Sequence, residues 1–232
     1  MTAAPLSPDL LWSELVAYGA GISLSPVHIG VLLLLLVGSH PLRRAGWFLL
    51  GWVLTTALAV ALLITVGHRL LLDMSMGTDH RTGLDLLAAG ALLALGLKEL
   101  LRRGSSEEAP GWTRSLERFV AMPIPLLLLL SAAAELISPD DLFLFAKAAS
   151  ALLAAGLSPL QETLDTALFT LGASALLLLP VLLVLLLGER SRPVLEGGRD
   201  WLFRRGDWLV GGLSLVLAGY LGWQGLVGLQ LN

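Results

Sequence analysis

Long apolar runs alternate with short stretches of charged residues, Gly and Pro along almost the whole chain. Each run is close to or above the roughly 20 apolar residues that a helix needs to cross the bilayer core. The pattern therefore predicts an all-α integral membrane protein with six transmembrane helices. They are expected at residues 10–38, 45–66, 84–101, 120–156, 164–188 and 209–229.

Two of these six segments are too long for one crossing. As unbroken helices, 10–38 and 120–156 would extend roughly 43 Å and 55 Å, against a hydrocarbon core of about 30 Å. A Ser-Pro pair interrupts each of them near its middle. Proline removes a backbone donor and disfavours helical geometry in the residue before it. We therefore expect a break or re-entrant turn at both sites, each followed by a half-helix with serine at its N-cap and proline at its first position.

Both interruptions lie in the first helix of a three-helix half. The first half covers 1–104 and the second 120–232, joined by a polar cytoplasmic linker at 105–119. Since each half crosses three times, the second is inverted relative to the first. Interrupted helices at matching positions of two inverted repeats are typical of a transporter's midplane binding site. Simple proline kinks are the alternative.

The basic residues indicate the orientation. Of fifteen Lys and Arg, most fall in the first, third and fifth connections. The positive-inside rule then predicts that these connections are cytoplasmic and that both termini face outward, in a bacterial inner membrane. The fifth connection contains a stretch, 190–206, that mixes Arg with apolar residues, which predicts either an interfacial helix or a solvated loop. Its Gly197-Gly198 pair argues against one continuous helix.

Composition narrows the function classes. Hydrophobic residues make up 56% of the chain and charged residues 14%, well below the roughly 25% of soluble domains. Cysteine is absent, which excludes disulfides, thiol redox chemistry and thiolate metal sites. We expect membrane lipids and a transported molecule as partners, no nucleic acid and no cofactor; a homodimer is compatible with the sequence.

Polar residues at membrane depth form the candidate binding and coupling site, because ionisable groups there are costly and usually functional. Asp140 and Asp141 either cap a half-helix or exchange cations or protons. His28 either faces these carboxylates or makes a structural hydrogen bond, and Lys147 either lines the site or snorkels to the interface. The full predicted set is Ser25, Pro26, His28, Glu135, Ser138, Pro139, Asp140, Asp141 and Lys147.

Several motifs carry a family likeness. The stretch 21–27 before a long aliphatic run, 51–54, Trp112 and 154–158 resemble the GAP family, the sulfolipid- and glycopeptidolipid-addressing proteins of the LysE transporter superfamily. The resemblance implies a six-span inner-membrane protein of two three-helix repeats, linked in related members to export of a lipid or glycolipid. Two positions depart from the family pattern: His28 replaces a second proline, and the acidic pair Asp140-Asp141 replaces a basic break.

The sequence thus favours a secondary exporter of a lipid, glycolipid or amphipathic metabolite, working by alternating access around the paired breaks. A proton- or cation-coupled exporter of an amino acid or metal ion is the main alternative. A structural membrane subunit is another. An intramembrane hydrolase built on Ser25, His28 and Asp141 lacks the Gly-x-Ser-x-Gly motif that hydrolases of the α/β fold carry, so we expect no enzyme.

Overall fold

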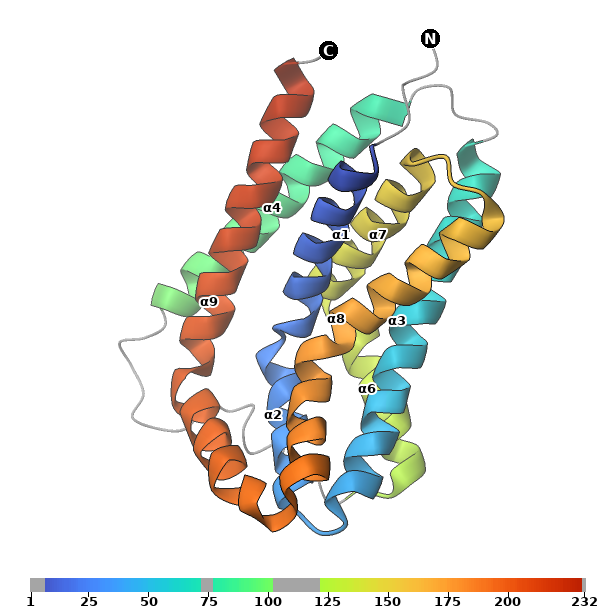
Figure 1. Cartoon of the computed structure of the whole chain (residues 1–232). Helices are drawn as coiled ribbons and strands as arrows, with labels where there is room; N and C mark the ends of the chain where they lie inside the picture. The colour runs from blue at the N-terminus through green and yellow to red at the C-terminus, as the bar shows by residue number, and fades with distance from the viewer. Residues whose placement is uncertain (1–6, 72–76, 102–121, 231–232) are drawn as a thin grey trace. The chain divides into compact units, whose positions relative to one another are not determined.

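The computed structural model describes residues 7–71, 77–101 and 122–230 of the chain, and within these ranges every regular element is helical (Figure 1). The predicted linker at 105–119 lies outside the described residues. The helices are α1 (Pro8–Ser23), α2 (Pro26–Val37), α3 (Pro41–Leu71), α4 (Gly77–Leu101), α6 (Ile124–Ile137), α7 (Pro139–Ala154), α8 (Pro159–Leu187), the short 3₁₀ helix η2 (Gly188–Ser191) and α9 (Arg192–Gln230). The all-α prediction is confirmed.

The structure has both predicted helix breaks. The first separates α1 from α2, with Ser25 at the N-cap of α2 and Pro26 following it, and the two helices meet at a bend of 56°. The second separates α6 from α7, with Ser138 in an extended conformation directly before Pro139. A third Ser-Pro pair starts α8, where Ser158 forms a capping box with Gln161. All three pairs occupy the positions that serine and proline prefer at helix starts.

Length and hydropathy identify α3 and the segment starting with α8 as helices able to cross a membrane. The bent pair α1–α2 gives a third span. Shorter apolar helices occur at Ala89–Lys98, Ile124–Ile137 and Gly211–Val227, within the other three segments predicted to cross. The structure therefore supports a membrane protein with two or three clear spans among the described residues, and the count of six stays a prediction.

The prediction for 190–206 needs one correction. Residues Arg192–Gln230 form one helix, α9, that runs through Gly197 and Gly198 without a break. Glycine lowers helix stability by only about 1 kcal/mol relative to alanine, so two of them do not end a long helix. The solvated-loop alternative for this stretch is therefore wrong.

The chain divides into two compact units, each formed by residues from both halves of the sequence. The first comprises Met1–His68 and Pro110–Phe203, and the second Arg69–Ala109 and Arg204–Asn232. In the first unit α1 packs against α7 and α8, and α2 also contacts α8. Figure 1 shows that α1–α2 runs downward while α6–α7 runs upward, so the two broken segments are antiparallel.

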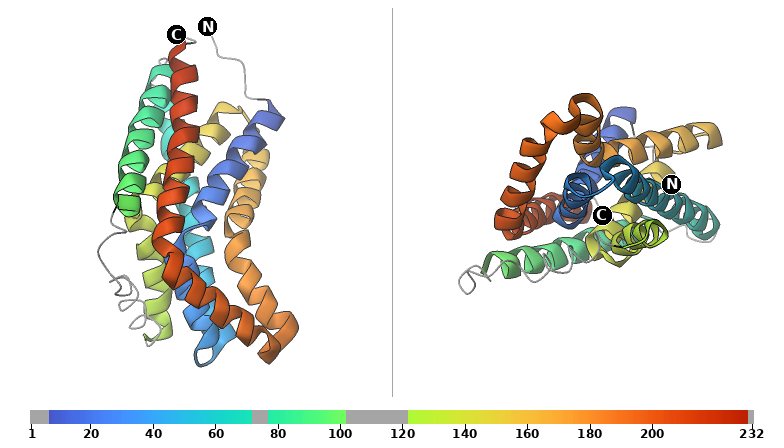
Figure 2. Two further views of the ribbon diagram at one scale, coloured as in Figure 1. Left: turned by 90° about the vertical axis from the view of Figure 1, so that its left-hand side faces the viewer. Right: turned by 90° about the horizontal axis from the view of Figure 1, so that it is seen from below.

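The second unit pairs α4 with the end of α9, which lie side by side in both views of Figure 2. Small residues allow this close packing. A Cβ placed at Gly96 would lie 3.0 Å from the Gly211 carbonyl oxygen, and one at Gly222 would lie 3.6 Å from the Ala89 side chain. Close backbone approach at glycine is typical of helix pairs in membranes.

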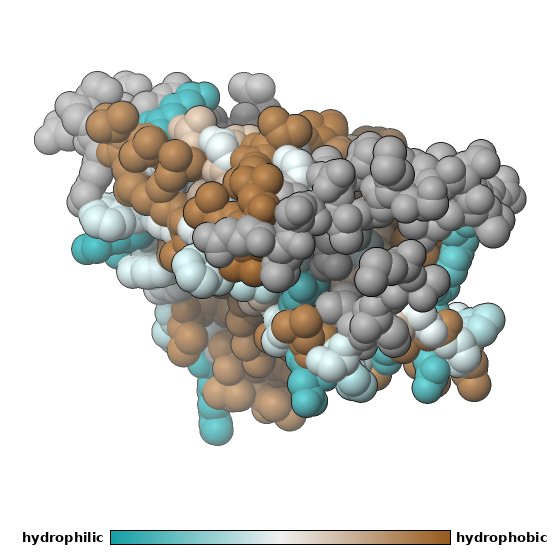
Figure 3. Space-filling model, turned by 90° about the horizontal axis from the view of Figure 1, so that it is seen from above, coloured by the Kyte–Doolittle hydropathy of each residue, from teal (hydrophilic) through white to brown (hydrophobic). Residues whose placement is uncertain are grey.

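Large apolar side chains cover the outside of the helices. Leu58, Leu62 and Leu129 are each more than 60% exposed, and Leu186 is 81% exposed. The face drawn in Figure 3 shows such hydrophobic residues at the surface. A soluble protein rarely exposes so much contiguous apolar surface, whereas a bilayer solvates it.

Candidate functional site

The first break holds a serine–histidine pair. Ser25 lies in the turn between α1 and α2, and its Oγ is 2.7 Å from Nδ1 of His28, one helical turn later. Ser25 therefore occupies the N-cap position but makes no side-chain bond to the helix backbone. Its hydroxyl instead fixes the orientation of the imidazole ring.

His28 is packed among aromatic side chains from α3. It is 2% exposed, its ring meets the Trp52 ring edge-on at a centroid distance of 4.3 Å, and Phe48 lies 6.3 Å away. Nε2 of His28 has no hydrogen-bond partner among the described residues. Since buried polar atoms are nearly always satisfied, this nitrogen is a candidate contact for a bound molecule.

The second break holds a buried carboxylate. Glu135 lies in the last turn of α6, is 0% exposed, and accepts a hydrogen bond from the Thr56 hydroxyl of α3. Its second oxygen, Oε2, has no partner among the described residues, and neither has the buried hydroxyl of Ser131 one turn earlier. Residues four apart share a helix face. The end of α6 therefore presents two polar groups with unused hydrogen-bonding capacity.

Helix α3 connects the two breaks. Trp52 contacts His28, and Thr56, one turn further along the same face, binds Glu135. Gly51 makes this possible, because a Cβ there would lie only 2.8 Å from the Leu128 carbonyl oxygen of α6. Trp52 and Thr56 were not among the predicted site residues; only the 51–54 family motif drew attention to this part of α3.

The acidic and basic residues of α7 are buried as well. Asp141 is 1% exposed and interacts electrostatically with Glu135. Lys147 is 3% exposed, with its Nζ 5.7 Å from the centre of the Tyr18 ring on α1. The snorkelling alternative for Lys147 is therefore wrong. The side chains of Pro26, Pro139 and Asp140 lie outside what the structure describes.

One charged residue of this region was not predicted. Glu14 of α1 is 7% exposed and accepts a hydrogen bond of 3.4 Å from the Tyr18 hydroxyl. Tyr18 thus lies between an acidic residue of its own helix and Lys147 of α7. The position of Glu14 near the start of an apolar run was the available signal, because acidic residues there are unusual.

His28 makes the structural hydrogen bond that was one of the two expectations for it. Among the described residues this bond goes to Ser25, and the ring contacts go to Phe48 and Trp52 of α3. A hydrolytic triad needs a carboxylate on the second ring nitrogen, and Nε2 has none within the described part of the chain. That part also holds no group of three or more His, Cys, Asp or Glu residues suited to a metal ion.

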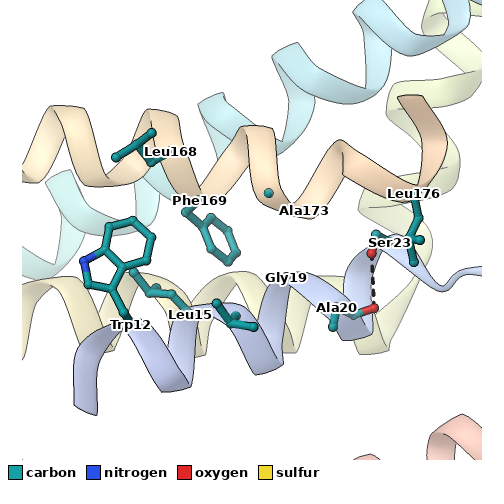
Figure 4. Close-up of a pocket in the computed structure, with 11 residues that line it drawn as sticks. Trp12, Leu15, Gly19, Ala20, Ser23, Leu168, Phe169, Ala173 and Leu176 are labelled. Carbon is teal, nitrogen blue, oxygen red and sulfur yellow. Dashed lines mark hydrogen bonds between the residues drawn. The ribbon is translucent and has the colours of Figure 1, made fainter. Parts of the chain in front are cut away.

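Two grooves flank α8 in the first unit. One, between α1 and α8, has a volume of about 340 Å³ and an almost wholly apolar lining (Figure 4). The other, between α3 and α8, has about 420 Å³ and carries Glu162 and Thr166 among its lining residues. Glu162 also pairs with His68, 2.9 Å away. Ligand pockets usually have volumes of roughly 300–1,000 Å³, so either groove is large enough for a small ligand or part of a larger one.

A family model described as Sap, sulfolipid-1-addressing protein, matches residues 15–227. The chain belongs to this family. The match includes both breaks and nearly all of the six predicted segments, which confirms the family suggested by the sequence motifs. Comparisons with curated proteins and with solved structures found no match. Membership in the Sap family and the apolar helices together identify a membrane protein with a role in lipid-related export.

Proposed function

We propose that this Sap family member is a secondary transporter that moves a lipid, glycolipid or amphipathic metabolite across a bacterial inner membrane. Transport proceeds by alternating access around the two helix breaks. One observation carries the proposal: Trp52 and Thr56, on one face of α3, join the polar groups of both breaks inside an apolar unit. A buried polar centre of this kind between broken helices suits a headgroup that must cross the bilayer midplane.

The proposal includes six spans in two inverted repeats, related to the LysE transporter superfamily. Reciprocal packing supports it. The first part of each broken segment packs closely on the long helix that follows the other broken segment: α1 on α8 through Gly19 and Ala173, and α6 on α3 through Gly51. Each compact unit also draws matching helices from both halves, as expected when two repeats are related by a pseudo-two-fold axis. Both termini then face outward.

The main alternative remains a proton- or cation-coupled exporter of a small solute. The two interacting buried carboxyl groups, Glu135 and Asp141, favour a coupling ion. Carboxyl groups at membrane depth are typical of proton relays in transporters. Such coupling is compatible with a lipid substrate as well, so the nature of the cargo distinguishes the two proposals.

A lipid-movement assay with the purified protein reconstituted into liposomes tests the proposed function. We expect the protein to accelerate movement of fluorescent lipids between leaflets, with one class of headgroup favoured, and Glu135→Gln to slow that movement. Leu62→Met, at an exposed apolar position of α3, is the matched control and should leave the rate unchanged. Acceleration of no lipid, together with uptake of an amino acid or metal ion driven by a pH gradient, would replace the lipid proposal by the alternative.

A further inference from the structure

The groove between α1 and α8 has the shape and lining expected of a binding site for one hydrocarbon chain. Figure 4 shows Trp12 at one end, Ser23 at the other, and the chain of apolar side chains between them. Ser23 is its one hydroxyl, and that group already donates to the Ala20 carbonyl at 3.3 Å. Polar side chains therefore occur only at the two ends of the groove, the indole N–H of Trp12 at one and the Ser23 hydroxyl at the other.

The length of the groove matches one leaflet. From Trp12 to Ser23 the α1 backbone rises by roughly 17 Å, and half of a hydrocarbon core of about 30 Å is about 15 Å. Its width is set by small residues, since Gly19 and Ala173 bring the two helices so close that a Cβ on Gly19 would lie 3.5 Å from the Ala173 backbone. Its volume of about 340 Å³ is at the lower end of the range for ligand pockets. A single extended chain suits this shape better than a ring system.

The end of the groove identifies the kind of molecule. Ser23 is the last residue of α1, and two residues later Ser25 begins the polar centre with its bond to His28. A ligand lying in the groove with its tail toward Trp12 thus has its other end beside the first break. An acyl lipid has this combination of a long apolar chain and a polar end, and here its headgroup would lie near the midplane, displaced from the interface where it rests in a bilayer.

We propose that the α1–α8 groove binds one acyl chain of a lipid and leads its headgroup to the Ser25–His28 pair. The inference rests on the proposed function for the fate of the lipid, but chain binding can be measured without transport. The groove faces the bilayer, because Val16 and Leu168 on its rim are 66% and 52% exposed. The chain therefore has sideways access to the groove from the hydrocarbon core, and with its tail toward Trp12 the lipid keeps the orientation that it has in the cytoplasmic leaflet.

Gly172→Leu is the discriminating variant. Gly172 lines the groove, and a Cβ there meets no atom within 4 Å, so the base of a leucine side chain has room and its branched end reduces the space left for an acyl chain. Gly46→Leu is the matched control, because Gly46 is also helical with nothing within 4 Å but lines neither groove. Equal unfolding midpoints for both variants establish that both fold.

The probe is a phosphatidylcholine with a photoreactive diazirine in one acyl chain, present at increasing mole fraction in nanodiscs. We expect labelling of peptides 12–23 and 168–176 to saturate at low mole fraction, while labelling around Leu129, an exposed position of α6 that lines neither groove, rises linearly. Gly172→Leu should reduce saturable labelling at least about tenfold, and Gly46→Leu should leave it unchanged. Linear labelling of the groove, or saturable labelling unaffected by Gly172→Leu, would overturn the inference.

Two further outcomes distinguish binding of an acyl chain from lipid transport and from packing between copies of the protein. Saturable groove labelling without any lipid movement by the wild-type protein would contradict the proposed function and leave chain binding in place. If Val16→Cys instead links two copies by a disulfide in high yield and the groove is not labelled, the groove is a helix-packing surface between copies. That outcome overturns the inference, and it is easily read because the chain has no native cysteine.

Discussion

Thr56→Val is the most informative single change, because Thr56 is the residue by which α3 binds the second break. The substitution keeps the shape of the side chain and removes the hydroxyl that donates to Glu135. Both residues are 0% exposed, so no bulk water replaces the lost donor. Glu135 then has no hydrogen-bond partner on either oxygen among the described residues, since Oε2 already has none.

The expected loss follows from two magnitudes. Leaving a buried acceptor without its donor costs about 1–3 kcal/mol, whereas hydrogen bonds between helices in membranes average about 0.6 kcal/mol and reach about 1.7 kcal/mol. Because both Thr56 and Glu135 are fully buried, we expect the energy of this bond to lie in the upper part of the range for hydrogen bonds between membrane helices. We therefore expect Thr56→Val to lower the free energy of unfolding by about 1–2 kcal/mol.

The adjacent residue provides the control. Thr55 is also buried, but its hydroxyl donates to the Gly51 carbonyl of its own helix at 2.8 Å. Thr55→Val leaves that carbonyl in the helical hydrogen-bond ladder, so we expect a loss below about 0.5 kcal/mol. The two variants have the same change of atoms in the same turn of α3 and differ in the partner they lose.

Reversible unfolding in mixed micelles measures both values, and a double-mutant cycle of Thr56→Val with Glu135→Leu isolates the pair. We expect a coupling energy of about 1 kcal/mol, within the usual range for contacting residues. A coupling near zero, or equal losses for Thr55→Val and Thr56→Val, would refute the assignment of Thr56 as the link between α3 and the second break.

Three further predictions concern packing and orientation. Gly51→Ala should destabilise the protein by about 1–3 kcal/mol in the same unfolding assay, because its Cβ would lie 2.8 Å from the Leu128 carbonyl oxygen. Gly172→Ala, in open space, should instead be neutral or stabilise by up to about 1 kcal/mol, and equal losses for both would contradict the close approach of α3 and α6. Tyr18→Phe should cost less than about 0.5 kcal/mol, since the bond to Glu14 is long at 3.4 Å and the ring near Lys147 is kept; a larger loss would show that the hydroxyl is essential. In intact cells an impermeant maleimide should label Leu160→Cys and not Ser39→Cys, and the reverse pattern would invert the proposed orientation.

The sequence predicted the backbone of this protein better than its side-chain contacts. Excess length and a Ser-Pro pair sufficed to predict both breaks, because proline acts on its own helix and needs no tertiary partner. The same local chemistry at Ser158 starts α8 at Pro159, five residues before the segment expected from residue 164. The continuous path of α9 through Gly197 and Gly198 was not predicted, because the cost of two glycines is small beside the stability of a long helix.

The side-chain contacts between different helices could not be predicted in the same way. Helices that are apolar nearly all round have no polar face to indicate which side is buried, so nothing in the sequence showed that Trp52 and Thr56 point toward the breaks. Lys147 illustrates the same limit. Its distance from Pro139 allowed snorkelling, and only the position of α1 beside α7, with the Tyr18 ring against its ammonium group, decides for burial.

Side-specific labelling of single cysteines at the two breaks decides whether they form one transport route. Ser25→Cys and Ser138→Cys are compared with Leu62→Cys, which is 64% exposed on the apolar outside of α3, in right-side-out and inside-out vesicles with a water-soluble maleimide. Alternating access predicts that both break positions react from either side, that a transported lipid slows the reaction, and that position 62 stays unreactive. Reaction of positions 25 and 138 from one side alone, or from neither, would contradict a route through the breaks.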